Sequence, residues 1–451
     1  MTVSPAVREA LVNHVKLVEG QSASGHALPA SEASFYVADL GEVVRKWNLW
    51  KGALPDVTPF FAVKSSYDRW LIQTLASCGA GFDCASAEEI ELILSLGISA
   101  QRIIFTHPCK PIASLGLCRR LGVTLITFDN ECELRKLHQH YPESHLVLRI
   151  FADDPTGIDP LGTKFGACRD DFRGLIGLAK ELHMHLAGAS FHAAPSVASN
   201  PIAYVRGVRH AAEVFAHARA LGLNPGILDI GGGYTDATFA AIATAVRGVV
   251  AECFAACKGR KGGLRVIAEP GTLFSSSPFF LTAKVVARRG NATAFGREPA
   301  TRLYINDGIY SNFMMRFIVN ATFSPIAVIQ KGAWREQKAG GDGAFKCSVW
   351  GRTCDSNDCI NRECGFDQEV DIGDWLVFKD MGGKPGYSPE LLITYMHTYE
   401  RVMVINDVAA YTTVCNTSFN GFTSSSHTIY LEPSEPGEKV KADFEPLRSK
   451  L

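Results

Sequence analysis

The chain repeats one pattern from about residue 60 to residue 270: a short apolar run rich in β-branched and aromatic residues, a polar residue, and then a longer amphipathic segment. This alternation is typical of consecutive strand–helix units. Eight such units predict an α/β fold, a closed (β/α)8 barrel of the TIM type. The eight apolar runs lie at 60–64, 80–83, 102–106, 123–129, 145–150, 186–192, 226–230 and 265–269.

The segments between the runs carry helix signals. In "SAEEIELILSLG", Ser86 and Glu89 have the spacing of a capping box, an apolar stripe follows, and Gly97 supplies a stop. These signals predict a helix between the second and third strands.

After residue 280 the pattern changes to alternating runs such as "FFLTAKVVARR" and "DIGDWLVF", separated by turn residues. This change predicts an antiparallel β domain that follows the barrel. We therefore expect three parts: an N-terminal segment, 1–35, that joins the β domain, a barrel over 36–280, and a C-terminal β domain over 281–451.

The composition narrows the function classes. The 45 basic and 46 acidic side chains give a net charge of -1 and form no long runs, so we expect neither nucleic acid nor a membrane as a partner. The N-terminus lacks the apolar stretch of a signal peptide or anchor, and thirteen scattered cysteines fit a reducing compartment. These features predict a cytoplasmic protein with a small-molecule ligand.

Four of the cysteines cluster within the expected β domain. Structural zinc is the weaker interpretation, because the spacings contain no C-x-x-C pair and no histidine is nearby. The four are Cys347, Cys354, Cys359 and Cys364.

Five charged or titratable residues end, or nearly end, a predicted strand. Singly, a lysine there can extend to solvent, an aspartate can cap a helix and a histidine can be a core residue. Because the carboxyl ends of barrel strands meet at one mouth, where active sites of this fold lie, the five together predict a site. They are Lys64, Asp83, Arg149, His192 and Glu269.

A lysine at an apolar barrel mouth suggests carbonyl chemistry. Desolvation lowers the pKa of such an amine and makes it a nucleophile towards an aldehyde. Pyridoxal phosphate is the commonest cofactor held in this way, and it needs an acidic partner, a flat group against its ring and backbone donors for its phosphate. Glu269, His192 and the triplet Gly231, Gly232 and Gly233 are candidates for these three roles.

Several motifs carry a resemblance to a known family. "PFFAVKS", "GFDCASAEEIE", "SFHAAPS", "LDIGGGY", "AEPG", "YINDGIY" and "WGRTCDSND" occur in order along nearly the whole chain. They resemble the eukaryotic ornithine decarboxylase family, which uses pyridoxal 5'-phosphate on a barrel followed by a β domain. The resemblance implies that Lys64 binds the cofactor aldehyde, Glu269 faces the pyridine nitrogen, His192 stacks on the ring and the glycine triplet holds the phosphate. Further cofactor contacts implied in this way are Asp83, Glu89, Arg149, Gly271 and Tyr411.

The same resemblance implies a homodimer whose active sites are completed across the interface. The "WGRTCD" motif would enter from the second subunit. Its Cys354 would control protonation at the substrate Cα after carbon dioxide leaves, and Asp355, with Phe419, would contact the substrate side chain.

The chain also departs from that family. Thr272 stands where an arginine normally grips the cofactor phosphate, which removes a bidentate cation. Ile318 and Val319 replace a Tyr-Asp pair whose aspartate helps to hold a distal amine. "HAAPS" replaces "HVGSG", and Ser356 replaces a glycine. Ornithine is therefore an uncertain substrate.

About 27 residues, 383–409, interrupt the family motif "DMGAYT" inside the expected β domain. One hypothesis is a functional lid or specificity loop. The other is a translated intron, because removal of the segment restores the family pattern.

The sequence thus predicts an enzyme that decarboxylates an L-amino acid with pyridoxal phosphate, with ornithine-to-putrescine conversion in polyamine synthesis as the plainest version. The alternatives are a paralogue that acts on another amino acid in alkaloid synthesis of the loline type, and a catalytically inactive regulatory homologue. A racemase with the same cofactor is a weaker alternative.

Overall fold

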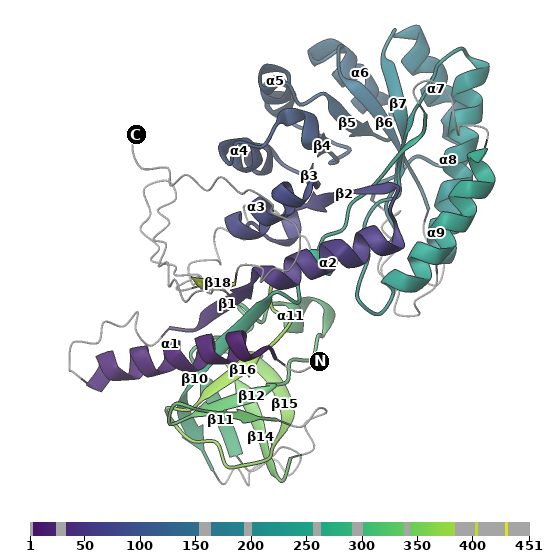
Figure 1. Cartoon of the computed structure of the whole chain (residues 1–451). Helices are drawn as coiled ribbons and strands as arrows, with labels where there is room; N and C mark the ends of the chain where they lie inside the picture. The colour runs from purple at the N-terminus through teal and green to yellow at the C-terminus, as the bar shows by residue number, and fades with distance from the viewer. Residues whose placement is uncertain are drawn as a thin grey trace.

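The computed structural model describes residues 3–23, 33–152, 164–193, 201–255, 263–290, 301–337, 343–383, 402–404 and 429–431. Two bodies are visible, a barrel with an outer ring of helices and a second, smaller β body, with helix α2 (Leu40–Ala53) between them (Figure 1).

Eight parallel strands close the barrel, in sequence order, with the last strand paired to the first. The (β/α)8 prediction is confirmed, and each expected apolar run overlaps one strand. The strands are β2 (Val57–Ala62), β3 (Gly81–Cys84), β4 (Ile103–Phe105), β5 (Leu125–Phe128), β6 (His145–Ile150), β7 (His185–Phe191), β8 (Ile227–Asp229) and β9 (Arg265–Ala268).

A ring of helices covers the outside of the barrel (Figure 1). Helix α4 shows why the local sequence folds in this way: the Ser86 hydroxyl accepts from the Glu89 N–H at 3.3 Å, and Gly97 has the left-handed φ of +78° beyond the last turn. The helix predicted there is confirmed. The ring consists of α3 (Arg69–Cys78), α4 (Ala87–Ser95), α5 (Ile112–Leu121), α6 (Glu131–His140), α7 (Phe172–Glu181), α8 (Ile202–Ala220) and α9 (Phe239–Cys253).

The barrel interior is filled by side chains from several strands, so it is a packed core and no pore. The β2 ring of Phe60 lies so close to β3 that a Cβ at Gly81 would be 2.6 Å from it. Other members of this inner cluster are Ile104, Leu125, Val147, Ala187 and Ile267. A filled interior leaves the strand ends as the place for a polar site.

The second body is a ten-stranded, mostly antiparallel sheet in the part of the chain that the structure describes. The prediction of an antiparallel β domain is confirmed; parallel pairs occur between β11 and β14 and between β1 and both β17 and β18. The strands are β1 (Phe35–Asp39), β10 (Phe279–Arg289), β11 (Thr301–Ile305), β12 (Ala327–Gln330), β13 (Ala333–Glu336), β14 (Phe345–Trp350), β15 (Cys359–Phe366), β16 (Trp375–Phe378), β17 (Val402–Val404) and β18 (Ile429–Leu431).

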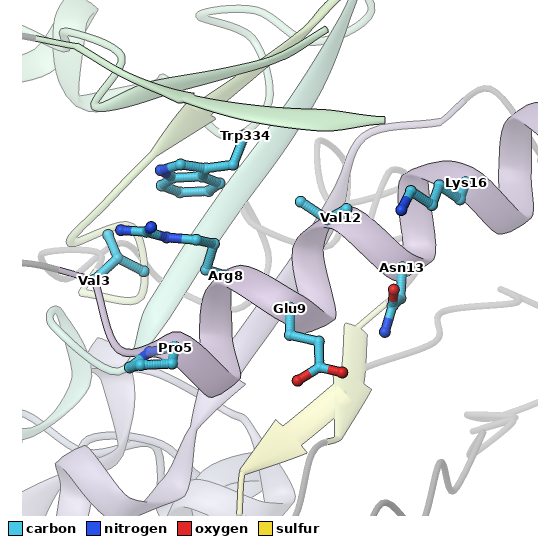
Figure 2. A pocket seen from close by; sticks show the side chains of 8 residues that line it. All are labelled: Val3, Pro5, Arg8, Glu9, Val12, Asn13, Lys16 and Trp334. Carbon is cyan, nitrogen blue, oxygen red and sulfur yellow. The ribbon is translucent and has the colours of Figure 1, made fainter. Parts of the chain in front are cut away.

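Helix α1 (Pro5–Ala23) packs on this sheet through a separate apolar cluster that includes Leu11, Phe35 and Trp375. Beside it lies a groove of about 610 Å³, lined by one face of the helix and by Trp334 (Figure 2). The Arg8 guanidinium stacks over the Trp334 ring at 5.2 Å. The groove contains none of the candidate site residues.

The division at residues 35 and 280 stays a prediction. Of the inserted segment 383–409, the structure describes Gly383 and strand β17, which pairs in parallel with β1 at Tyr36 and Val402. Tyr411 and Phe419 lie outside the described residues. In the parts of the chain that are described, no helix has the length and apolarity needed to cross a membrane.

Candidate active site

Lys64 lies just beyond β2, in a single 3-10 turn (Val63–Ser65) that follows the strand. Its Nζ is 3.2 Å from Oδ2 of Asp83, a fully buried carboxylate on β3 that also accepts from the Thr106 hydroxyl. The core strand therefore ends on a cation because the neighbouring strand supplies a buried anion.

The environment of Lys64 corrects one expectation. Burial lowers the pKa of the amine, but the carboxylates of Asp83, Glu269 and Glu89 outweigh it, and the net pKa lies above the ordinary lysine value. The prediction of a lowered pKa from desolvation was wrong for this chain without cofactor, because three anions surround the ammonium group.

Glu89, in the first turn of α4, is almost fully buried and lies close enough to raise the Lys64 pKa. Its carboxyl accepts from the Ala85 N–H at 2.6 Å and from the Tyr67 hydroxyl at 3.0 Å. Burial is the main cause that raises its pKa to about 7. Glu89 is thus a second buried carboxyl, besides Asp83, whose pKa depends on the charge of Lys64.

Arg149 lies on β6, and its positive charge lowers the pKa of Lys64, against the effect of the three carboxylates. Its guanidinium lies over the Phe165 ring at 5.3 Å, and His107 packs edge-on against the same ring at 5.5 Å. The Phe165 ring thus contacts both the Arg149 guanidinium and the His107 imidazole.

His192 and Glu269 follow β7 and β9, and their side chains meet: His192 Nδ1 is 3.0 Å from Glu269 Oε2. Burial opposes ionisation of Glu269, but His192, Lys64 and Asp229 lower its pKa to about 2. Burial raises the pKa of Asp229, and Glu269 raises it further. Burial and the neighbouring groups thus move the pKa values of the two acids apart, that of Glu269 downward and that of Asp229, at the end of β8, upward.

The glycine triplet follows β8 and lies against these residues. A Cβ at Gly232 would be 2.6 Å from the Glu269 carbonyl oxygen and 2.8 Å from the His192 ring. Gly231 and Gly233 have φ values of +66° and +93°, which favour glycine. Gly271, beyond β9, is equally close to the lysine turn, since a Cβ there would be 3.0 Å from Ser65.

Cys354 and Asp355 lie in the loop between β14 and β15, on the β domain. The Asp355 carboxylate accepts from the Tyr310 hydroxyl and from the Asn357 N–H, both in its own domain. Cys354 is exposed. Among the described residues, no hydrogen bond or ion pair joins these two residues to the group around Lys64.

The residues at the barrel mouth fit pyridoxal phosphate. A primary amine, an ionised carboxylate and an imidazole lie together, next to a glycine loop in which neighbouring protein atoms leave no room for side chains.

Comparison with known proteins decides the family. Residues 40–276 match the family model for the pyridoxal-binding domain of pyridoxal-dependent decarboxylases. The chain belongs to this family. Its enzyme class is that of the pyridoxal-phosphate-dependent amino-acid decarboxylases, so the inactive regulatory alternative is not supported.

The relatives within the family include proteins named as amino acid decarboxylases and as ornithine decarboxylases. The amino acid decarboxylase lolD1 of Epichloe uncinata is 67% identical over 99% of both chains. The ornithine decarboxylase of Neurospora crassa is 37% identical over 91% of this chain and 82% of its own. Among solved structures, the Paramecium bursaria Chlorella virus arginine decarboxylase bound to agmatine matches with a TM-score of 0.70 and 30% identity, over 82% of this chain and 94% of that one.

Sequence reasoning missed two residues of the site. Asp229 ends β8 within the quoted motif "LDIGGGY", and the same strand-end rule that selected Asp83 would have found it. Tyr204, on α8, donates to the Gly232 carbonyl at 2.6 Å. It carries no local signal, because its partner lies 28 residues further along the chain.

Proposed function

We propose that this chain binds pyridoxal 5'-phosphate at Lys64 and decarboxylates an L-amino acid other than ornithine, as a step of alkaloid synthesis of the loline type. The observation that carries the cofactor assignment is the group of Lys64, Asp83, His192 and Glu269 at one barrel mouth. The substrate assignment is supported by the 67% identity to lolD1 and by the residues at 318 and 319.

Each residue has a distinct part in this proposal. When bound, the cofactor withdraws electrons from the bond between the substrate Cα and its carboxylate. Lys64 holds the aldehyde, and the anionic Glu269 keeps a proton on the pyridine nitrogen. His192 would lie against the ring, and it fixes the Glu269 carboxylate through its 3.0 Å contact. The glycine loop holds the phosphate.

The remaining parts concern the second subunit. We propose a homodimer in which Cys354 of one subunit controls protonation at the substrate Cα in the site of the other and Asp355 contacts the substrate side chain. The exposed position of Cys354 on a loop between β14 and β15 supports this arrangement, since it is open to a partner.

Ornithine remains the second candidate substrate, because the chain is 37% identical to an ornithine decarboxylase. With Val319 in place of the family's aspartate, a distal ammonium group loses one of two anionic partners, which weakens its binding by about 1–3 kcal/mol. An amino acid whose distal group needs only one anion fits this pocket better.

Two measurements test this proposal: the absorbance spectrum of the chain with the cofactor, and the rate of carbon dioxide release. Purified chain is titrated with pyridoxal phosphate, and the visible band of a lysine-bound cofactor is followed in the parent and in Lys64→Ala. Carbon dioxide release is then measured with ornithine, lysine, arginine and N-substituted diamino or amino-carboxyl acids. A band that Lys64→Ala abolishes, with turnover on a substituted acid and little on ornithine, is expected. Efficient putrescine formation would overturn the substrate assignment, and no band would overturn the cofactor assignment.

A further inference from the structure

The backbone of the loop that follows β8 is held at Gly231, Gly232 and Tyr234. The Gly231 N–H donates to Asp229 Oδ1 at 2.9 Å, and the Gly231 carbonyl accepts from the Glu269 N–H at 2.7 Å. The Gly232 carbonyl accepts from the Tyr204 hydroxyl at 2.6 Å, and the Tyr234 carbonyl accepts from the Thr272 hydroxyl at 3.1 Å. Two of the four anchors are neutral side-chain hydroxyls from distant parts of the chain.

The Tyr204 anchor sets the direction of one N–H group. In a trans peptide the carbonyl and the following N–H point in opposite directions. Since the Gly232 carbonyl points at the buried Tyr204 hydroxyl, the N–H of Gly233 points away from it. The hydroxyl also lies 2.8 Å from where a Gly233 Cβ would be, so a side chain at this position would displace the Tyr204 anchor.

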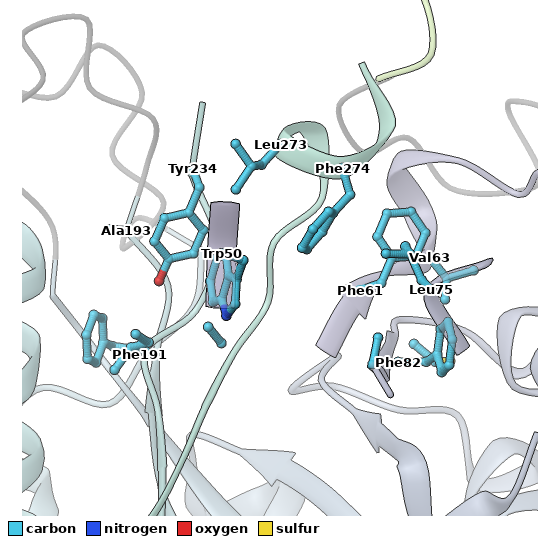
Figure 3. Packing of buried hydrophobic residues seen from close by; sticks show 14 of the residues in the cluster. Trp50, Phe61, Val63, Leu75, Phe82, Phe191, Ala193, Tyr234, Leu273 and Phe274 are labelled. Carbon is cyan, nitrogen blue, oxygen red and sulfur yellow. The ribbon is translucent and has the colours of Figure 1, made fainter. Parts of the chain in front are cut away.

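The Tyr204 ring is itself held firmly. It is buried, 5.6 Å from the Tyr234 ring and 6.3 Å from the Phe191 ring. Tyr234 in turn packs edge-on against Trp50 at 5.2 Å, and Figure 3 shows the two rings together near Leu273. The anchor is therefore part of the core, and its position does not depend on a ligand.

Thr272 occupies the position at which the resembling family has an arginine. Its hydroxyl donates a hydrogen bond to the carbonyl of Tyr234, a residue two positions after Gly232. Lys46 reaches the far end of the same loop, but its ammonium is paired with Asp236 and lies 3.7 Å from Glu42. These two carboxylates neutralise it, so it does not replace the missing cation.

We infer that Tyr204 and Thr272 are positioning residues for the cofactor phosphate: their hydroxyls hold the loop after β8 by two of its carbonyls, so that the N–H of Gly233 faces away from Tyr204 and binds the phosphate without an arginine. Rigid backbone donors need no reorganisation when the anion arrives, which offsets the loss of a charge. This inference rests on the proposed function.

The test separates phosphate recognition from general folding. Binding of pyridoxal phosphate and of pyridoxal, which has the same ring and aldehyde but no phosphate, is measured by equilibrium titration for the parent, Tyr204→Phe and Thr272→Val. We expect each variant to bind pyridoxal phosphate about tenfold more weakly while its affinity for pyridoxal changes less than twofold. Thr272→Val serves where Tyr204→Phe does not fold.

Two further variants complete the design. Tyr141→Phe is the matched control, because this buried tyrosine also donates to a backbone carbonyl, that of Val123, away from the site. It should leave the ratio of the two affinities unchanged. Adding Thr272→Arg to Tyr204→Phe supplies a cation and should restore the preference for the phosphorylated cofactor.

The outcomes are distinguishable. Equal weakening of both cofactors, or no weakening of either, in Tyr204→Phe and Thr272→Val would overturn the positioning role. Failure of the parent chain to bind pyridoxal phosphate would instead overturn the proposed function.

Discussion

At the scale of single residues, the site consists of acids and bases that set one another's charge. Glu269 is buried, yet its pKa is about 2, because His192, Lys64 and Asp229 stabilise the anion. A carboxylate that stays ionised at every physiological pH suits a permanent partner for a protonated ring nitrogen.

Replacing Glu269 should therefore lower the rate of decarboxylation more than it weakens cofactor binding. Glu269→Gln keeps the size of the side chain but removes its charge, and we expect turnover to fall about 100-fold or more. The measurement is the initial rate of carbon dioxide release with the cofactor site filled. The exposed Glu181→Gln is the control, and a Glu269→Gln enzyme with parental turnover would contradict the role.

Glu89 gives a prediction about pH. Its pKa is raised from 4.5 to about 7, so between these values the folded chain without cofactor keeps a proton that the unfolded chain has lost. Its contribution to stability is full below pH 4.5 and decreases as the pH rises to 7. The Glu89→Gln variant has no group that titrates here, so its stability does not show this decrease. The difference in free energy of unfolding between variant and parent should thus grow in the variant's favour by about 3 kcal/mol from pH 4.5 to 7.

Denaturant unfolding of both chains at several pH values measures this difference, and the other titrating groups cancel because both chains contain them. A difference that does not change with pH would show that Glu89 has an ordinary pKa.

At the scale of elements, the loop between β14 and β15 depends on one buried carboxylate. Asp358 accepts from the Ile309 N–H at 2.8 Å, from the Thr353 N–H at 3.0 Å and from the Thr353 hydroxyl at 2.7 Å. These bonds join the loop that carries Cys354 to the segment after β11.

Asp358→Asn replaces one acceptor oxygen with a donor that faces other donors. We expect a loss of about 2 kcal/mol in stability, and a fall of about 2–4 °C in the melting temperature, with a larger relative loss of turnover. Thermal unfolding and carbon dioxide release measure the two effects. The exposed Asp56→Asn should change neither the melting temperature nor the turnover. An Asp358→Asn variant with the stability and the activity of the parent would contradict the idea that this residue holds the loop.

Patterns along the sequence predicted the elements well because barrel strands and their helices are local, periodic structures. The strand-end rule also selected Lys64, Asp83, His192 and Glu269, which the structure brings together. The rule did not predict that Tyr204 belongs to the site or that the pKa of Lys64 is raised. Both depend on groups that only the closed barrel places side by side.

At the scale of the whole molecule, the proposed dimer can be tested by mixing subunits. Lys64→Ala and Cys354→Ala should each be nearly inactive. If sites are shared, random exchange makes half of the dimers mixed, and each mixed dimer has one intact site, so activity should return to about a quarter of the parental value. Activity is measured after the two variants are co-expressed. No recovery, while each variant still forms dimers, would indicate that every site uses residues of one subunit.

The pairing of β1 also bears on how this protein is made. Its antiparallel partner β10 begins at Phe279, so all eight barrel strands leave the ribosome before β1 finds that neighbour. We expect the barrel to close first during translation. Until then, the apolar residues of α1 and β1 have no sheet to cover them, and chaperones that bind exposed apolar segments are expected to protect this end of the nascent chain.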